Sequence, residues 1–179
     1  MAINASTDIL IRLSVVASAG DTTASTGATS LGDQVSTTAM GTSLHSLFDV
    51  ISGSANAAST VDYRCVFILN NHATLTAYGV TVFLTGAVTS GADVTIALDN
   101  IATSAKGSAS AQAATIATKT TAPTGVGSFS APGTDGAGLV VGDLAPGQVK
   151  GIWIKRAAAN TGPVSADGVT LNWALDTAA

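Results

Sequence analysis

The stretch that decides the fold is residues 61–69, Val-Asp-Tyr-Arg-Cys-Val-Phe-Ile-Leu. Successive side chains of an extended strand point to opposite faces, so the Val, Tyr, Cys, Phe and Leu at its odd-numbered positions share one face. Val66 and Ile68 make the other face apolar as well. A strand that is apolar on both faces is typical of the interior of a sheet. The stretch therefore predicts a central β-strand.

Several other stretches combine apolar alternation with turn residues at their ends, which is the pattern of half-buried strands. About seven such strands predict an all-β fold, an antiparallel β-sandwich of immunoglobulin-like or jelly-roll-like type. Gly79 lies in the middle of one of them and predicts a bulge or a close contact there. The further strands are expected at 9–16, 74–85, 94–98, 139–141 (an edge strand), 149–156 and 169–176.

Long stretches between these strands consist mainly of small residues. Residues 17–41 contain few large apolar side chains and predict a long N-terminal arm or loop. Residues 102–132 predict a long connection between sheets, in which Ser and Thr argue against a helix.

The segment after the arm has two interpretations. Apolar side chains recur at helical spacing over residues 44–51, so this stretch forms either a short helix or a strand-like anchor for the arm, and residues 53–60 are a linker. We therefore expect one domain in two parts. Residues 1–60 form a first strand and an arm that packs on the domain or on a partner, and residues 61–179 form the sandwich core.

The composition excludes several classes of function. Only 10% of the residues are charged, the net charge is −4, and no run of Lys or Arg indicates nucleic-acid binding. The apolar runs are too short to span a membrane, and the first residues do not resemble a signal peptide. Uncharged surface costs little to desolvate, so this composition favours docking into a larger assembly.

The residue types that carry chemistry are sparse. His45, His72 and Cys65 do not form a zinc-binding pattern, and Cys65 lies on an apolar strand face where thiols are inert. Most of the aspartates adjoin Gly or Asn and are typical turn residues. We therefore predict a protein that is not an enzyme and has no metal or cofactor.

Trp153 is the main candidate for an interface residue. It lies opposite Ile152 and Ile154 on its strand and is followed by Lys155 and Arg156. Trp and Arg are frequent at the centres of protein interfaces, and an exposed Trp can also stack on a sugar. The alternative is that Trp153 packs on a second covered face of the sheet.

Three stretches together resemble a loosely defined group of tailed-bacteriophage virion proteins associated with the head. They are Thr29-Ser30-Leu31-Gly32-Asp33, residues 62–71 (Asp-Tyr-Arg-Cys-Val-Phe-Ile-Leu-Asn-Asn) and residues 144–156 (Leu-Ala-Pro-Gly-Gln-Val-Lys-Gly-Ile-Trp-Ile-Lys-Arg). The resemblance extends from Leu31 to Leu175.

The resemblance implies a capsid decoration (cement) protein on the virion surface, made in the host cytoplasm. Its partners would be the major capsid protein and further copies of itself, as a homotrimer, without nucleic acid or membrane. Leu31 and Val35 in the arm would join Trp153, Lys155 and Arg156 as interface residues. The alternative function is a carbohydrate- or receptor-binding sandwich of a phage tail or fibre or a cell-surface adhesin, with Trp153, Trp173 and Tyr78 as stacking surfaces.

Overall fold

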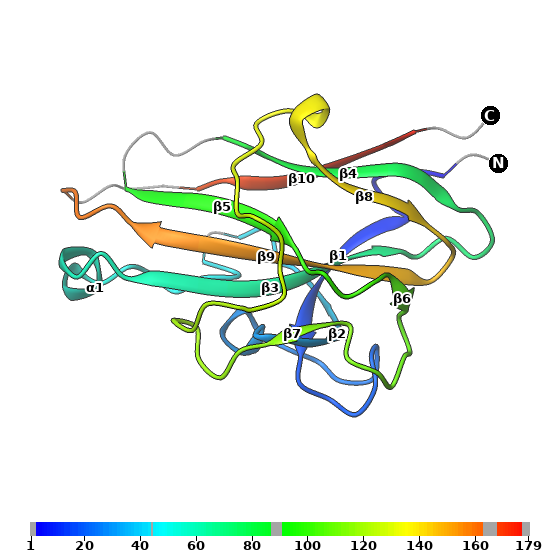
Figure 1. Cartoon of the computed structure of the whole chain (residues 1–179), viewed down its shortest axis with the longest axis horizontal. Coiled ribbons are helices and arrows are strands. Elements are labelled where there is room, and N and C mark those ends of the chain that lie inside the picture. Colours follow the sequence, from blue (N-terminus) through cyan, green and yellow to red (C-terminus); the bar gives the residue numbers. More distant parts are fainter. Residues whose placement is uncertain (1–2, 44, 87–90, 163–167, 177–179) are drawn as a thin grey trace.

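The computed structural model, which describes residues 3–43, 45–86, 91–162 and 168–176, consists of two antiparallel sheets (Figure 1). The larger sheet has the strand order β5-β9-β3-β1-β2-β7, with β6 paired to β9, and the smaller has the order β10-β4-β8. The predicted all-β, antiparallel sandwich is confirmed. The strands are β1 (Ile9–Val15), β2 (Gly32–Ala39), β3 (Val61–Asn70), β4 (Ala77–Thr85), β5 (Ala92–Leu98), β6 (Ser104–Ala105), β7 (Ala113–Thr115), β8 (Leu139–Leu144), β9 (Gln148–Ala158) and β10 (Thr170–Asp176).

The predicted central strand is β3, which lies between β9 and β1. It pairs with β9 without interruption from Val61 opposite Ala157 to Leu69 opposite Val149. Its two faces enter different clusters of buried side chains, which explains why both are apolar. Val66 and Ile68 face the smaller sheet, whereas Cys65, Phe67 and Leu69 face away from it.

The core between the sheets, here called the inter-sheet core, is built from aliphatic side chains. It takes contributions from strands of both sheets. Burying such side chains is the main favourable contribution to folding, at about 1.5–3 kcal/mol for each. Its buried members are Ile9, Ile11, Leu13, Val66, Ile68, Ala77, Val80, Val82, Leu84, Ile96, Leu144, Ile152, Ile154 and Leu171.

The second cluster, here called the outer cluster, lies on the opposite face of the larger sheet. The long connection between β5 and β8 covers that face, and in Figure 1 it crosses in front of β3, β9 and β5. Bridges of Ile96 with Ser130 and of Asp99 with Val126 fix its path. Residues 102–132 of this connection are not helical, as predicted, and they include β6 and β7. The buried members of the cluster are Val35, Cys65, Phe67, Leu69, Ala113, Ile116, Val149 and Trp153.

The predicted N-terminal arm is not confirmed. Residues 32–39 form β2, which pairs with β1 on one side and β7 on the other. The loop before β2 is also held to the body of the protein, since Gly20 N donates to Ser108 O and Ser30 Oγ donates to Cys65 O. The predicted boundary at residue 60 stays a prediction, but β1 and β2 belong to the larger sheet.

The helix expected from the spacing at 44–51 is wrong for the residues that the structure describes, and Leu44 lies outside them. Residues 45–48 form a turn and bends instead, and residues 49–51 have no regular structure. The short helix α1 (Gly53–Ala57) lies in the predicted linker, where the Ser52 side chain accepts a hydrogen bond from Ala55 N. Two 3-10 turns, η1 (Gly27–Thr29) and η2 (Asp135–Ala137), complete the structure. None of the described helices is long and apolar enough to cross a membrane.

The predicted bulge at Gly79 is confirmed. The register between β4 and β8 shifts between Ala77 and Val80, and Gly79 has a φ of 57°. A Cβ atom at this position would collide with the carboxylate of Asp176. Glycine therefore satisfies both the left-handed backbone and the close approach of β10.

Candidate docking surface

Trp153 is fully buried, so its assignment as an interface residue is wrong. Its indole lies in the outer cluster, and its Nε1 donates a hydrogen bond of 2.9 Å to Asp99 Oδ2. The interpretation that Trp153 packs on a second covered face is correct, because the long connection covers that face. A buried indole cannot stack on a sugar, so Trp153 does not serve the carbohydrate-binding alternative either.

The two candidates from the predicted arm also face inward. Val35 of β2 is 1% exposed in the outer cluster, and its amide donates to Gln112 Oε1. It is therefore wrong as an interface residue. Leu31 is half-buried and packs against the same cluster. Both side chains tie β2 to the larger sheet.

Arg156 belongs to a set of charged side chains that we name the charged cluster: Asp49, Asp62, Arg64, Lys119 and Arg156. Its Nη2 lies 2.6 Å from Asp62 Oδ2, and its Nη1 donates to Asp49 O. Burial lowers the pKa of Arg64, although Asp62 and Asp49 oppose that shift.

The charged cluster anchors residues 47–50, which have no regular structure of their own. The Phe48 ring lies 4.6 Å from the guanidinium carbon of Arg156 and 5.7 Å from that of Arg64, which are distances for cation–π contact. Arg156 therefore holds this segment to β3 and β9. The neighbouring Lys155 is half-buried and, unlike Arg156, forms no ion pair with a described residue.

Asp99 is an important buried residue that the sequence reasoning treated as a turn residue. Its Oδ2 accepts hydrogen bonds from Trp153 Nε1 and Ala114 N, and its Oδ1 accepts one from Ile101 N. Three donors satisfy this buried carboxylate, which connects β9 to the start of the covering connection at Ile101 and to its middle at Ala114. A single aspartate after a strand gives no sequence signal that distinguishes such a role from a turn.

Cys65 and the histidines do not form a catalytic arrangement. Cys65 is buried in the outer cluster, and burial raises the pKa of its thiol well above the usual value. His72 Nδ1 accepts hydrogen bonds from Thr74 N and Leu75 N, and His45 is exposed elsewhere. No three His, Cys, Asp or Glu side chains among the described residues gather in a way that could hold a metal ion.

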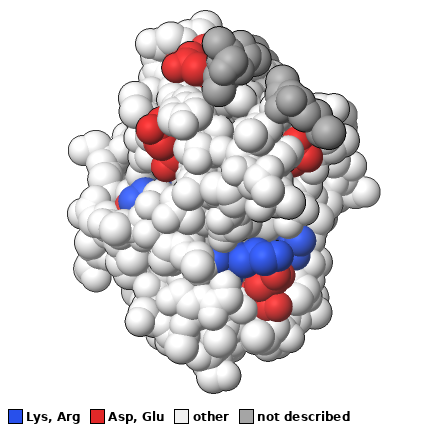
Figure 2. All heavy atoms as spheres, turned by 90° about the vertical axis from the view of Figure 1, so that its right-hand side faces the viewer, with Lys and Arg blue, Asp and Glu red and all other residues white. Residues whose placement is uncertain are grey.

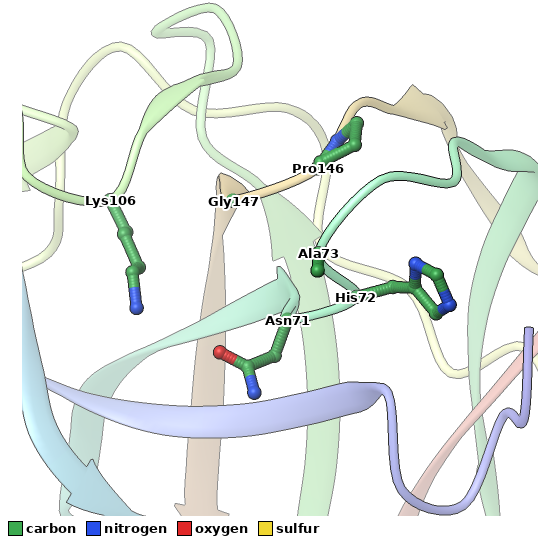
Figure 3. A pocket seen from close by; sticks show the side chains of 6 residues that line it. All are labelled: Asn71, His72, Ala73, Lys106, Pro146 and Gly147. Carbon is green, nitrogen blue, oxygen red and sulfur yellow. The ribbon is translucent and has the colours of Figure 1, made fainter.

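His72 contributes to the wall of an open hollow of about 260 Å³ at one end of the molecule, which Asn71, Ala73, Lys106, Pro146 and Gly147 also line. Figure 3 shows its ring directed away from the Lys106 side chain across the hollow. The ammonium group of Lys106 forms a 2.9 Å ion pair with Asp21. Lys106 and the Nδ1 atom of His72 are therefore engaged with the protein itself.

In the part of the chain that the structure describes, the outward face of the smaller sheet keeps exposed apolar side chains. On β4, Val80, Val82 and Leu84 are buried, whereas the alternate residues Tyr78 and Phe83 are exposed and half-buried, and Phe83 belongs to neither core cluster. Val140 of β8 is 71% exposed, the highest value among the large apolar side chains described. We name this surface the bare face: Tyr78, Thr81, Phe83, Val140, Asn172 and Ala174.

The bare face is hollowed and has acidic residues at its rim. A hollow of about 380 Å³ lies between β4, β8, β10 and η2, lined by Thr81, Val140 and Ala174 with Asp135 and Asp176. The Thr81 hydroxyl donates to Asp135, and Gly79 N donates to Asp143 Oδ1. These contacts hold the carboxylates at the edge of the face.

The basic residues are confined to one part of the fold, whereas aspartates occur on both sheets. All seven Lys and Arg residues lie on the larger sheet or its covering connection, whereas β4, β8 and β10 carry no basic residue. Figure 2 shows one end of the molecule as mostly neutral, with red acidic atoms both above and directly below the main blue group. A surface with this pattern fits a neutral or basic partner better than an acidic one.

No protein-family model, no curated protein and no solved structure matches this chain. The resemblance to phage virion proteins therefore stays a prediction.

Proposed function

We propose that this chain is a structural, non-catalytic protein that decorates a tailed-phage capsid and docks on the shell through the bare face. The observation that carries this proposal is a sheet face left open to solvent on a chain that covers both faces of its other sheet. Val140 and Tyr78 stand exposed on that face, at 71% and 45%. A partner that buried them would gain apolar contact at little cost in desolvated charge.

The two longer stretches that resemble phage virion proteins become neighbours in the fold. Residues 62–71 lie on β3 and residues 144–156 on β9, and the two strands pair along their length. Most of their side chains are buried, so these motifs make the scaffold rather than the contact surface. Within this proposal, the smaller sheet makes the contact with the capsid. The resemblance supports a phage virion as the assembly but does not identify the contact surface.

Decoration would act mechanically. Packed DNA pushes capsid subunits apart, and a protein that spans a junction between subunits opposes that separation with its own interface area. A stable interface buries about 1,600 Å² in total. Many identical copies on a symmetric shell add their contributions through avidity.

The test begins with the particle. Purified virions are analysed by quantitative mass spectrometry, and decoration predicts a copy number comparable to that of the major capsid protein. Absence from the virion, or a few copies for each particle, would overturn the proposal.

The contact surface is tested on particles stripped of this protein. Rebinding of Val140→Glu and Tyr78→Glu variants should fall at least tenfold, because each introduces a charge that has to be desolvated at the interface. Val16→Glu is the matched control, since Val16 is 65% exposed but lies beyond the end of β1 and outside the bare face. Equal loss in all three variants would argue against the bare face as the contact surface.

The carbohydrate-binding alternative keeps one favourable observation, the exposed ring of Tyr78. Trp153 is buried, and Trp173 is half-buried with its Nε1 donating to Ala5 O. Binding to a glycan array that is lost in a Tyr78→Ala variant would favour this alternative over decoration.

A further inference from the structure

Strand β10 has a free edge. It is the terminal strand of the smaller sheet and pairs with β4 on one side, and no strand that the structure describes pairs with its other side. Five consecutive residues, Thr170 to Ala174, keep regular register with β4. An open edge with regular backbone geometry offers unpaired N–H and C=O groups to another strand.

Apolar side chains accompany this edge. Trp173 and Leu175 point toward the inter-sheet core and pack against it, yet both stay only half-buried. Leu171, which shares their face, is 7% exposed. The core is therefore incompletely closed along β10, and a neighbouring strand would cover these side chains as well as the backbone.

The outer edges of β8 and β5 are protected. The register of β8 against β4 shifts twice, and its Gly142 has a φ of 85°, so its edge is irregular. Ser130 and Val126 of the covering connection form bridges along β5 and its end. Irregular geometry and covering segments are common ways to prevent strand addition. Over its first five residues strand β10 keeps regular register with β4, and it carries no Lys or Pro. Among the described residues, the N-terminal turn contacts this strand through the hydrogen bond from Trp173 Nε1 to Ala5 O.

We propose that β10 is a self-association edge, on which the β10 strand of a second copy adds in antiparallel orientation about a two-fold axis at Trp173. In this register Leu171 faces Leu175 of the second copy, and Asn172 faces Ala174. Asp176 faces the Thr170 hydroxyl, so like charges do not meet. The two Trp173 side chains lie opposite each other, and aromatic cross-strand pairs of this kind are favourable.

A second copy is the occupant that this strand fits best, because the sequence Thr-Leu-Asn-Trp-Ala-Leu-Asp complements itself when reversed. The two-fold axis keeps the inward faces of both small sheets on the same side. The result is one continuous six-stranded sheet with order β8-β4-β10-β10-β4-β8. This pairing does not depend on the proposed capsid role, and it differs from the trimer that the resemblance implies.

The experiment measures mass. The purified full chain is studied by sedimentation equilibrium over a range of concentrations, where the wild type should approach twice its chain mass of 17.5 kDa. The double variant Asn172→Lys/Ala174→Lys places lysines opposite each other at two positions, and the dissociation constant should rise at least tenfold. Both side chains lie on the bare face, so the fold should be preserved.

Two controls make the test specific for the register. Asn172→Asp/Ala174→Lys places opposite charges across the same two positions and should keep the dimer. Val140→Lys places a lysine on β8, the other edge of the sheet, and should also keep it. Circular dichroism confirms that each variant is folded.

A wild type that stays monomeric or forms a trimer overturns the proposal, and so does a double-lysine variant that dimerises as the wild type does. If that variant fails to fold, hydrogen exchange of the wild-type amides at residues 170–176 decides. Protection that rises with protein concentration supports the pairing, and protection independent of concentration overturns it. Either result is separate from virion copy number, which tests the proposed function.

Discussion

Strands β3 and β4 are both interior strands of their sheets, but they meet different surroundings on their outward faces. Nearly every side chain of β3 is buried, whereas those of β4 alternate between buried and accessible. The difference comes from the connection between β5 and β8, which covers the outward face of β3 but contacts β4 at the rim of its outward face, where the Thr81 hydroxyl donates to Asp135. The same chain thus uses one sheet as a closed scaffold and presents the other to the surroundings.

The largest expected effect comes from removing the indole at the centre of the covered face. Trp153→Ala should lower the free energy of unfolding by about 3–5 kcal/mol, because it leaves a cavity and removes a donor from Asp99. Phe83→Ala on the accessible face of β4 is the matched control and should cost about 1 kcal/mol or less. Urea unfolding measures both. Similar losses at the two positions would mean that both faces are equally covered.

The next effect concerns the carboxylate that joins the connection to β9. Asp99→Asn should cost about 2–3 kcal/mol, because an amide nitrogen replaces one acceptor and leaves a buried N–H donor unsatisfied. Asp143→Asn is the control on the smaller sheet, where one exposed hydrogen bond from Gly79 N is affected, and about 0.5 kcal/mol is expected. Chemical denaturation followed by indole fluorescence reports both changes. An Asp99→Asn variant as stable as the control would show that Asp99 does not anchor the connection to β9.

The Arg156→Met variant tests whether the charged cluster anchors residues 47–50. The variant removes the closest partner of Asp62 and one cation from the Phe48 ring, so a loss of about 1–2 kcal/mol is expected after allowance for partial exposure. Limited proteolysis should cut within 45–52 faster than in the wild type. Lys155→Met, one residue earlier on β9, should leave the cleavage rate unchanged; faster cleavage there too would point to general loosening of β9.

The smallest effect is the dependence of stability on alkaline pH through Cys65. Burial raises the pKa of its thiol in the folded protein. The stability that the neutral, buried thiol contributes is therefore fully present below the unfolded-state pKa and is lost progressively as the pH rises above it. The free energy of unfolding should therefore be about 1 kcal/mol lower at pH 9 than at pH 7 because of this group. The difference between wild type and Cys65→Ala isolates it. A stability difference that does not change with pH would contradict the burial of the thiol.

The sequence predicts those strands whose buried side chains are large. Alternation over 61–69 and 169–176 identifies β3 and β10, and the apolar residues of 149–156 identify β9. Strand β2 was missed because its sequence, Gly-Asp-Gln-Val-Ser-Thr-Thr-Ala, contains one large apolar side chain. Its buried Gln34 and Ser36 are held by pairing and hydrogen bonds to distant residues, which local composition does not reveal.

The candidate surface was less predictable for a related reason. A strand that is apolar on both faces can present one face to a partner or pack it under another part of the chain, and Trp153 fits both descriptions. The connection that covers it consists largely of Ala, Ser, Thr and Gly, so its sequence resembles a loop exposed to solvent. The apolar spacing at 44–51 allowed a helix where the structure has none. Its apolar side chains Leu47 and Phe48 instead anchor an irregular segment to the core.

The pairing of β3 with β9 has a consequence for synthesis on the ribosome. Val61 meets Ala157, so β3 leaves the ribosome long before the strand that hydrogen-bonds its whole length. Contacts so distant along the chain slow folding, and meanwhile the run Val-Phe-Ile-Leu at 66–69 has one unpaired edge. The nascent chain is therefore most prone to aggregation just before β9 (Gln148–Ala158) appears, and a truncation ahead of Gln148 should form insoluble material rather than a smaller folded domain.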